Sequence, residues 1–316
     1  MRADTVLCHL KSASVSAGVR GLSGALVDLE FDLGGRLFRP LAAPPWNGAP
    51  EFASNPPAAH LTVIGGEWPC VPFGISAHDP VKHGRGTDSF WQLVASDRRS
   101  ANLAIDYPEG HAVARLERTI TLSDTLPRVE LTLTIHARRA ARMPVGLHPN
   151  LAFPDRPGSL RITAATHGEA TTARAARARS TSALAPDQTI GADGITRLKH
   201  GGTTCLWDQP GPKGEDLVFL RDCAGWVEAA DTDRGMVTRI EWDAATLPHL
   251  LMWIANPGLS GEPRLKGFHG LGLEPVASYY DETPEGAEGL DLTPGQPVTI
   301  RYAITCRSIS PKEAAP

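Results

Sequence analysis

A two-residue alternation of apolar and polar side chains restricts the fold of this sequence more than any other feature. In residues 129–135, aliphatic side chains occupy the odd positions and polar or charged ones the even positions. Residues 26–33 and 298–306 alternate in the same way. Successive side chains of a strand point to opposite faces, so each run predicts a strand with one buried and one solvated face. Strands of this kind are typical of antiparallel sheets.

Shorter segments extend this all-β interpretation. The pair Gly34-Gly35 follows the first run and precedes Leu37 and Leu41, which predicts a hairpin. Apolar runs predict five more strands, at 114–122, 160–164, 216–220, 236–242 and 250–255. No amphipathic helix of ten or more residues separates them, which argues against βαβ units and a parallel sheet. The best helix candidate is the short segment 88–96.

The content of helix-breaking residues points the same way. The 316 residues include 31 glycines and 27 prolines, which argues against an α-solenoid, a coiled coil or a helical bundle. Hydrophobic residues make up 41% of the chain, enough for a large core, so wholesale disorder is excluded. No internal repeat supports a propeller or a β-helix.

The strand pattern predicts one large domain. Proline- and glycine-rich stretches at 43–57 and 210–214 are interpreted as long loops, because alternating strands resume on both sides of each without a change in composition. We therefore expect a single antiparallel β-sandwich over residues 1–308. The remaining residues, 309–316, are predicted to form a disordered tail.

Charge and targeting signals limit the partners. The formal net charge is -4, so no bulk field would attract nucleic acid or an anionic membrane. The densest basic stretch contains Arg174, Arg177 and Arg179 and lacks interleaved aromatic residues, which predicts a solvated loop or a short helical face. No apolar run suits a signal sequence or a membrane span. We expect a cytoplasmic protein.

The five cysteines are odd in number and include no C-x-x-C pair. This usage suits a reducing compartment and argues against a disulfide framework or a zinc cluster. The two nearest histidines, His78 and His83, form no established metal-binding pattern. We therefore expect neither a metal nor a cofactor.

Four segments combine polar functional groups with turn-forming and aromatic residues. They are residues 65–74, which contain Trp68; residues 83–91, which contain His83, Arg85 and Trp91; residues 146–150, around His148; and residues 270–275, around Glu274 and preceded by Trp253. None of them matches a nucleophile elbow, a phosphate-binding P-loop or a dinucleotide fingerprint. Acyl transfer, ATP use and dinucleotide binding therefore lack sequence support.

His148 and Glu274 each allow a structural and a functional interpretation. The proline after His148 favours an extended backbone, and an imidazole can give or take a proton near neutral pH. The alternative is an ordinary half-buried histidine. Glu274 lies between Leu273 and Pro275 in an apolar stretch, and acidic residues are rarely buried without a partner or a task. The alternative is a glutamate at a strand edge paired with a nearby basic residue.

Taken in order, these segments resemble the aldose 1-epimerase (galactose mutarotase) family. The resemblance rests on His83-Gly84 with Trp91 downstream, on residues 146–149 and on residues 272–275. The opening residues 21–37 look like the first hairpin of the family. The matching segments extend over nearly the whole chain. The family implies a large antiparallel β-sandwich, the galactose mutarotase-like supersandwich, with an open sugar-binding cleft and no cofactor or metal.

The resemblance also implies roles for individual residues. The glutamate of the G-x-x-E-P type segment, here Glu274, acts as the general base on the anomeric hydroxyl. The histidine of the H-P segment, here His148, acts as the general acid to the ring oxygen, and His83 hydrogen-bonds the sugar. The two catalytic groups would then face one cleft, roughly 5–8 Å apart across a sugar-sized gap. Trp68, Trp91 and Trp253 would offer flat apolar surface to a sugar ring, with core packing as the alternative.

The sequence also departs from the family pattern. Typical members carry an asparagine-arginine pair before the H-G segment, and the arginine contacts the sugar, whereas residues 67–73 here contain no arginine. The family also has an aspartate that discriminates between sugars. It has no clear match in this sequence, and Asp208 and Asp216 are the candidates. Because Arg85, Arg264 and Lys266 are basic, they are candidates for binding an anionic substituent of the sugar.

The leading hypothesis is a cofactor-independent mutarotase for an aldose or a modified aldose, with a small sugar as its partner. One alternative is a 1-epimerase for a hexose phosphate or another anionic sugar. The other is a carbohydrate-binding protein without catalytic activity. The oligomeric state is open between a monomer and a homodimer.

Overall fold

The computed structural model describes residues 1–46, 48, 50–52, 54–175, 178–265, 267–280 and 288–310. Within these residues there is no α-helix, and every strand pair is antiparallel. The part of the chain that the structure describes includes two short 3-10 helices, η1 (Ala59–Val63) and η3 (Pro263–Leu265). The predicted all-β, antiparallel fold class is confirmed.

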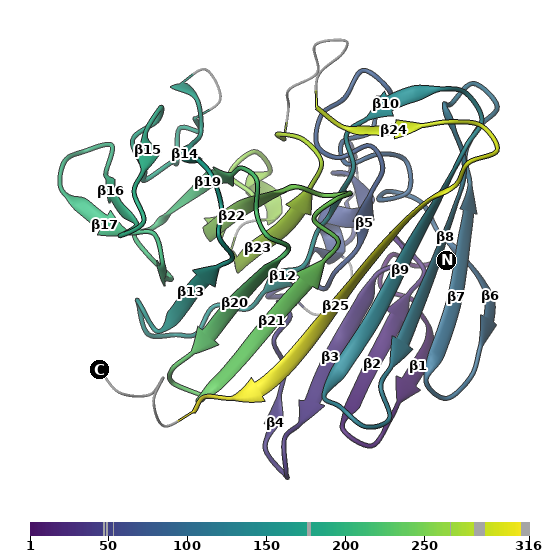
Figure 1. Cartoon of the computed structure of the whole chain (residues 1–316), viewed down its shortest axis with the longest axis horizontal. Coiled ribbons are helices and arrows are strands. Elements are labelled where there is room, and N and C mark those ends of the chain that lie inside the picture. Colours follow the sequence, from purple (N-terminus) through teal and green to yellow (C-terminus); the bar gives the residue numbers. More distant parts are fainter. Residues whose placement is uncertain are drawn as a thin grey trace.

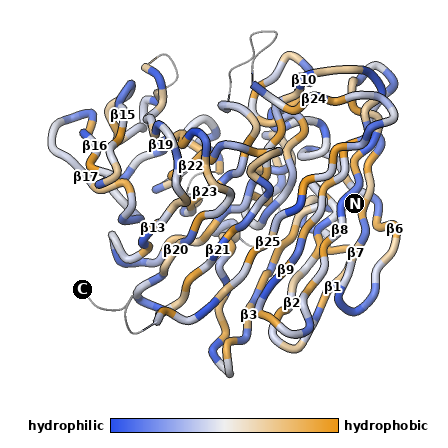
Figure 2. Tube along the Cα trace, in the orientation of Figure 1, coloured by the Kyte–Doolittle hydropathy of each residue, from blue (hydrophilic) through white to orange (hydrophobic). Residues whose placement is uncertain are grey.

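The largest sheet has nine strands and forms the broad front layer in Figure 1. In spatial order its strands are β18 (Asp208–Gln209), β13 (Leu160–Ala164), β20 (Trp226–Asp231), β21 (Met236–Trp242), β25 (Val298–Ser308), β9 (Arg128–Ala137), β8 (Val113–Leu122), β7 (Ser100–Asp106) and β6 (Gln92–Ser96). Apolar and polar residues alternate along its long strands, as Figure 2 shows.

A second sheet of eight strands carries the residues of interest. Its order is β15 (Thr189–Ile190), β14 (Ala170–Thr172), β19 (Gly214–Leu220), β22 (His249–Gly258), β23 (Phe268–Val276), β11 (Gly146–Leu147) and β5 (Pro69–Cys70), and β12 (Asn150–Leu151) also pairs with β23. The N-terminal sheet contains β1 (Val6–Lys11), β2 (Val15–Arg20), β3 (Leu26–Asp32) and β4 (Leu37–Phe38). Two ribbons pair β10 (Ala141–Met143) with β24 (Leu290–Leu292) and β16 (Ile195–Arg197) with β17 (Thr203–Cys205).

The eight-stranded sheet is buried on both faces. One face contributes Met252 and Leu273 to the main core, which also contains Leu131 and Ile304 of the nine-stranded sheet. The other face contributes a second apolar cluster that includes Leu251. This double burial explains why β22 is a nearly continuous apolar run, because a strand without a solvated face has no polar side to alternate with.

Most predicted strands are found within two or three residues of their expected bounds, including the hairpin of β3 and β4. The alternation in β3 is interrupted, however, since Asp28 has a φ of 51° and the pairing with β2 shifts register there. As a result Leu26 is fully buried and Val27 only partly, the reverse of the predicted alternation.

The predicted helix at 88–96 is wrong. Residues 92–96 form β6, which pairs with β7 at the edge of the nine-stranded sheet. Pairing with a neighbouring strand therefore outweighs a weak local preference for helix. The interpretation of 43–57 as a loop agrees with the absence of a strand among its described residues, and the predicted tail lies outside the described residues from 311 onward.

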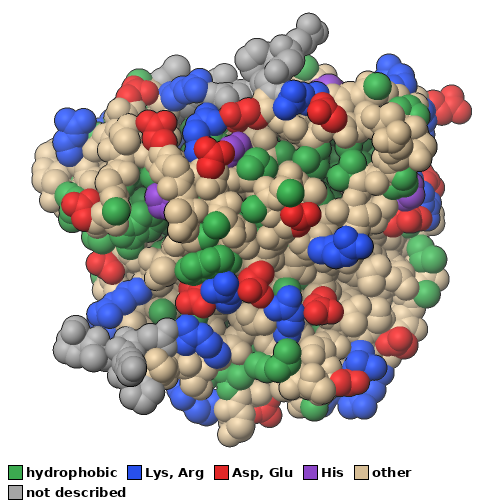
Figure 3. Space-filling model, in the orientation of Figure 1, with side chains coloured by type: hydrophobic (Ala, Val, Ile, Leu, Met, Phe, Trp, Pro, Cys, Tyr) green, Lys and Arg blue, Asp and Glu red, His purple; other side chains and the backbone are tan. Residues whose placement is uncertain are grey.

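Charged side chains of both signs are interspersed over the face seen in Figure 3, in keeping with the small net charge. In the described part of the chain, no helix is long and apolar enough to cross a bilayer. Nor do the described residues place three or more His, Cys, Asp or Glu side chains together in a group that would hold a metal ion.

Candidate active site

A cavity of about 200 Å³ lies against the face of the eight-stranded sheet that points away from the main core. The sheet contributes Glu215 and Leu217 from β19, Leu251 and Trp253 from β22, and Glu274 from β23. The 3-10 helix η1 and the connecting loops contribute the remaining lining residues. Its walls combine aromatic and aliphatic surface with a few charged groups, which is typical of a small-molecule site.

Strand register brings His148 and Glu274 together. Gly146 pairs with Val276 and Asn150 pairs with Gly272, so His148 lies directly across from Glu274. Side chains directly opposite each other on one face of a sheet are near neighbours. The imidazole Nε2 of His148 is 3.5 Å from Oε1 of Glu274. The pair therefore faces one cavity, at a shorter separation than the predicted 5–8 Å.

Glu274 is almost completely buried, with 1% of its surface exposed. Burial raises the pKa of its carboxyl well above that of an ordinary glutamate, although the positive charges of Lys82 and Arg179 act in the opposite direction. Space for the carboxylate comes from Gly272, two residues earlier on the same face of β23. A Cβ atom at this position would overlap Oε1 of Glu274.

His148 is held by its backbone and by an aromatic stack. Its amide donates to the carbonyl of Trp68, and the two rings stack with centroids 4.4 Å apart. Nδ1 of the imidazole is buried and has no hydrogen-bond partner. Burial, together with the positive charge of Lys82, lowers the pKa of His148 to about 3. Its Nε2 lies next to the carboxyl group of Glu274.

His83 reaches the same cavity from a tight loop. Its backbone is in the left-handed region, with a φ of 62°, and its ring centroid is 5.1 Å from that of His148. The amide of Gly74 donates to Nδ1 of His83 at 3.3 Å. Burial and the neighbouring His148 lower the pKa of His83 well below the ordinary value, so the imidazole is neutral at pH 7. A neutral ring that accepts at Nδ1 carries its proton on Nε2 and can donate it to a ligand.

Sequence reasoning missed a charged cluster opposite this pair. The carboxylate of Glu215 accepts from the indole Nε1 of Trp253 at 3.0 Å and from the amide of Ser260 at 2.7 Å, and Arg179 forms an ion pair with it. Burial alone would raise the pKa of Glu215, but Arg179 and these two donors outweigh it and lower the pKa. The buried carboxylate is thereby kept charged next to the cavity.

Lys82 and His60 are two further lining residues that the sequence analysis did not single out. Nζ of Lys82 lies 5.2 Å from the ring centroid of Tyr280, which also lines the cavity. His60 bonds through Nδ1 to Asp88 at 3.0 Å. Lys82 directly precedes His83, so its position next to the H-G segment was the signal that could have identified it.

Several predicted residues lie elsewhere. The side chain of Arg85 is exposed and does not line the cavity. Asp216 points to the opposite face of β19 from Glu215, where it accepts from the amides of Ala183 and Leu184. The structure therefore places neither residue in the cavity. For Asp216 the reason is that successive side chains of a strand point in opposite directions. Asp208 is exposed in β18 and does not line the cavity either.

The basic residues are also distributed differently from the prediction. Arg264 is exposed and bonds to Glu262 and to the carbonyl of Asn55. Lys266 and Arg177 lie outside the described residues. Arg179, predicted to lie on a solvated loop or helical face, instead lines the cavity in its ion pair with Glu215. Trp68 and Trp253 line the cavity, whereas Trp91 is buried in the main core.

No family model and no curated protein sequence matches this chain. Solved structures do. A protein from Escherichia coli K12, described as a candidate aldose 1-epimerase, superposes with a TM-score of 0.67 at 16% identity, covering 96% of this chain and 99% of that one. An aldose epimerase homologue from C. elegans gives 0.68 at 10% identity, covering 96% and 98%.

A galactose mutarotase-like protein from Lactobacillus casei superposes with a TM-score of 0.59 at 13% identity, covering 95% of this chain and 99% of that one. Identities this low carry the fold and not the chemistry. The similarity extends over nearly the full length of each chain, as the order of the sequence motifs predicted. The resemblance is therefore confirmed at the level of architecture: this chain has the galactose mutarotase-like fold.

Proposed function

We propose that this protein is a mutarotase that interconverts the α and β anomers of an aldose or a modified aldose. The observation that carries the proposal is the pairing of His148 with Glu274, side by side in a buried cavity of the galactose mutarotase-like fold. Among the described residues neither forms an ion pair with a residue outside the pair, and Arg264, a basic residue near Glu274 in the sequence, bonds to Glu262. His148 and Glu274 interact with each other instead.

Anomer exchange requires a base and an acid close together. The base removes the proton from O1 of the sugar while the acid protonates the ring oxygen O5, and the C1–O5 bond breaks. Rotation about C1–C2 in the open aldehyde, followed by the reverse proton transfers, closes the ring with the other configuration. O1 and O5 are bonded to the same carbon, so a short separation between Glu274 and His148 suits this reaction.

In this proposal the pair carries one proton in total, which the opposite pKa shifts place on Glu274 in the free protein. Transfer of this proton across the 3.5 Å between Oε1 and Nε2 precedes the reaction, in which Glu274 is the base and His148 is the acid. The transfer of that proton into the sugar is matched by the proton that leaves O1, so the pair ends each half-reaction with the same charge. His83 donates from Nε2 to a sugar oxygen, and Trp253 and Trp68 provide apolar surface for the ring. Cofactor chemistry is not needed for any of these steps.

The pH dependence follows from the same pair. Activity requires one shared proton, so kcat/KM falls at low pH as the pair gains a second proton and at high pH as it loses the first. Burial lowers the pKa of His148 to about 3 and raises that of Glu274, and both shifts widen the range in which one proton is held. We expect the acidic limb of kcat/KM to lie well below the ordinary histidine pKa of ~6.5. A limb at or above that value in rate measurements corrected for uncatalysed mutarotation would contradict the proposed pair.

One observation favours an anionic sugar as the substrate. Lys82 lines the cavity, and no described carboxylate lies within ion-pairing distance of its Nζ, whereas the guanidinium of Arg179 is already paired with Glu215. A sugar with a phosphate or carboxylate substituent would supply the missing negative charge. A 1-epimerase for such a sugar is the second candidate function.

The test is anomer exchange measured by NMR on a panel of neutral and acidic aldoses. We expect at least one sugar to exchange faster with the protein than without it. Faster exchange of the acidic sugars only would select the second candidate. Binding without acceleration of any sugar would refute the enzyme and leave a carbohydrate-binding protein.

A further inference from the structure

The loop that carries Lys82 and His83 is held in place from outside the cavity. It runs from Asp79 to Thr87, has no regular secondary structure, and contains His83 in a left-handed conformation that is uncommon for a residue with a side chain. The next residue, Gly84, also has a positive φ, and a Cβ there would overlap the carbonyl of Val71. Such a backbone persists only where the surroundings determine it.

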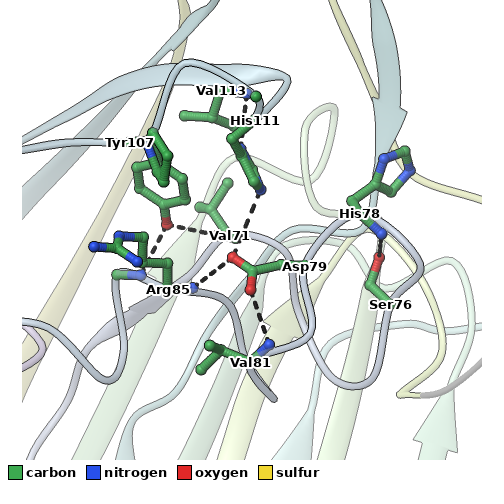
Figure 4. A network of polar contacts seen from close by, with 12 residues as sticks. Val71, Ser76, His78, Asp79, Val81, Arg85, Tyr107, His111 and Val113 are labelled. Carbon is green, nitrogen blue, oxygen red and sulfur yellow. Dashed lines mark hydrogen bonds and ion pairs between the residues drawn. The ribbon is translucent and has the colours of Figure 1, made fainter.

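Asp79 supplies that constraint. The residue is 5% exposed, and Oδ1 accepts from the amide of Val81 at 2.8 Å while Oδ2 accepts from the amide of Arg85 at 2.8 Å. Figure 4 shows the carboxylate between these two amides. The two bonds tie together the positions that flank Lys82 and His83. One buried side chain therefore fixes both ends of the segment that enters the cavity.

Two ring side chains surround these contacts: His111 lies beside Asp79 without a hydrogen bond to it, and Tyr107 bonds to the backbone of Gly86 and Val71. The amide of Val113 donates to Nδ1 of His111, so a neutral His111 carries its proton on Nε2, which lies 3.6 Å from Oδ2 of Asp79. Burial lowers the pKa of His111, although Asp79 acts in the opposite direction. Tyr107 donates to the carbonyl of Val71 at 2.7 Å and accepts from the amide of Gly86 at 3.0 Å. Figure 4 shows both rings across the Asp79 carboxylate from Val81.

None of these three side chains lines the cavity. His83 does, and its ring has a defined orientation because its Nδ1 accepts from Gly74 and its own amide donates to the Gly74 carbonyl. Both bonds depend on the path of the loop. We propose that Asp79 is a positioning residue, which holds Lys82 and His83 in the geometry that the site needs without touching the ligand.

The inference rests on the proposed function only for its activity measurement. Asp79→Ala removes both acceptors, and Asp79→Asn keeps one oxygen, which can serve only one of the two amides. We expect kcat/KM to fall roughly 10- to 100-fold in Asp79→Ala and less in Asp79→Asn, with both kcat and KM affected, because small displacements of a positioned group carry costs of this size. In hydrogen exchange, the amides of Val81 and Arg85 should lose protection in Asp79→Ala, and Asp79→Asn should protect one of them.

Asp231 offers a matched control. It is also a buried aspartate, 2% exposed. Its carboxylate accepts a hydrogen bond from the amide of Arg234 in the turn between β20 and β21, away from the cavity. Asp231→Ala should lower the melting temperature and leave kcat, KM and the exchange of the 81–85 amides at their wild-type values. A loss of kcat/KM in Asp79→Ala that Asp231→Ala does not share supports positioning over general destabilisation.

Separate outcomes address the two proposals. If the wild-type protein accelerates the anomer exchange of no sugar, the proposed function fails. The role of Asp79 is then still decided by two measurements, the hydrogen exchange of the Val81 and Arg85 amides and the NMR resonances of the His83 imidazole. Wild-type amide protection and unmoved His83 resonances in Asp79→Ala would overturn the inference. If that variant does not fold, Asp79→Asn decides in the same way, through unequal or unchanged protection of the two amides.

Discussion

Glu274→Gln is expected to abolish most of the anomer exchange while the protein stays folded. Glutamine has nearly the shape of glutamate but cannot accept a proton from O1, and a general base contributes about 10²–10⁴ in rate. The melting temperature should change little, because the carboxylate of Glu274 is fully buried and its only described ion-pair partner is His148. A neutral amide has less to lose on burial than a carboxylate.

The control for this variant is Glu228→Gln. Glu228 lies on β20 and forms ion pairs with Arg239 and Arg307, outside the cavity. Its replacement should leave the exchange rate at the wild-type value. If Glu274→Gln retained wild-type exchange, Glu274 would be a buried glutamate with a structural role only, and His148 would have no base beside it.

The sequence predicted the positions of the strands best where one face of the sheet is exposed to solvent. Alternation in β9 and β25 follows directly from burial of one side of each strand, and both were placed correctly. The short edge strand β6 was misassigned because most of its residues are exposed and their pattern does not alternate. Its structure depends on pairing with β7, which local sequence does not encode.

The site was harder to predict, because it lies on a sheet whose faces are both buried. Glu215 and Asp216 are adjacent, both nearly inaccessible, and the residues of β19 give no polar side by which to tell one face from the other. The sequence analysis selected Asp216, and the structure places Glu215 in the cavity. Pairing of Leu217 with Trp253 is what assigns the face, and that register is a property of the folded sheet.

A long-range contact also explains why the position of Arg179 was missed. Arg179 lies in an alanine- and arginine-rich stretch whose composition favours a solvated segment. Its ion pair with Glu215 joins a loop to a strand 36 positions away, and no periodicity in the sequence of either segment predicts this ion pair. By contrast His148 and Glu274 were identified through the family resemblance, and the register of β23 with β11 and β12 supplies the physical reason that they meet.

The segment 65–74 was selected because it combines polar functional groups with turn-forming and aromatic residues, and in the structure neighbouring residues of this segment have two different roles. Trp68 faces the cavity, whereas Glu67 points the other way and is fully buried. Its carboxylate pairs with Arg118 of β8 and accepts from the hydroxyl of Tyr302 on β25 at 2.8 Å. Arg118 also donates to the carbonyl of Gly24 at 2.8 Å. This buried network links the cavity-bearing segment to the nine-stranded sheet.

Arg118→Met is therefore expected to cause the largest loss of stability of any substitution considered for this protein. Removing one partner of a buried ion pair leaves an uncompensated charge, which costs about 3–5 kcal/mol in the free energy of unfolding. Chemical denaturation of the wild type and the variant measures this difference. A loss below about 1 kcal/mol would mean that water or a rearranged partner reaches Glu67, against the complete burial of both side chains.

The double variant Arg118→Met/Glu67→Gln separates the cost of the unpaired charge from the loss of packing. Glutamine keeps an oxygen for the hydroxyl of Tyr302 and removes the negative charge, so the double variant should be more stable than Arg118→Met alone. Recovery of most of the loss would show that the pair contributes little net stability and that its removal is harmful mainly through the charge left behind. If the double variant were no more stable than the single one, the unpaired charge would not be the source of the loss, and the cost would lie in the other contacts of the buried Arg118, such as its bond to the carbonyl of Gly24.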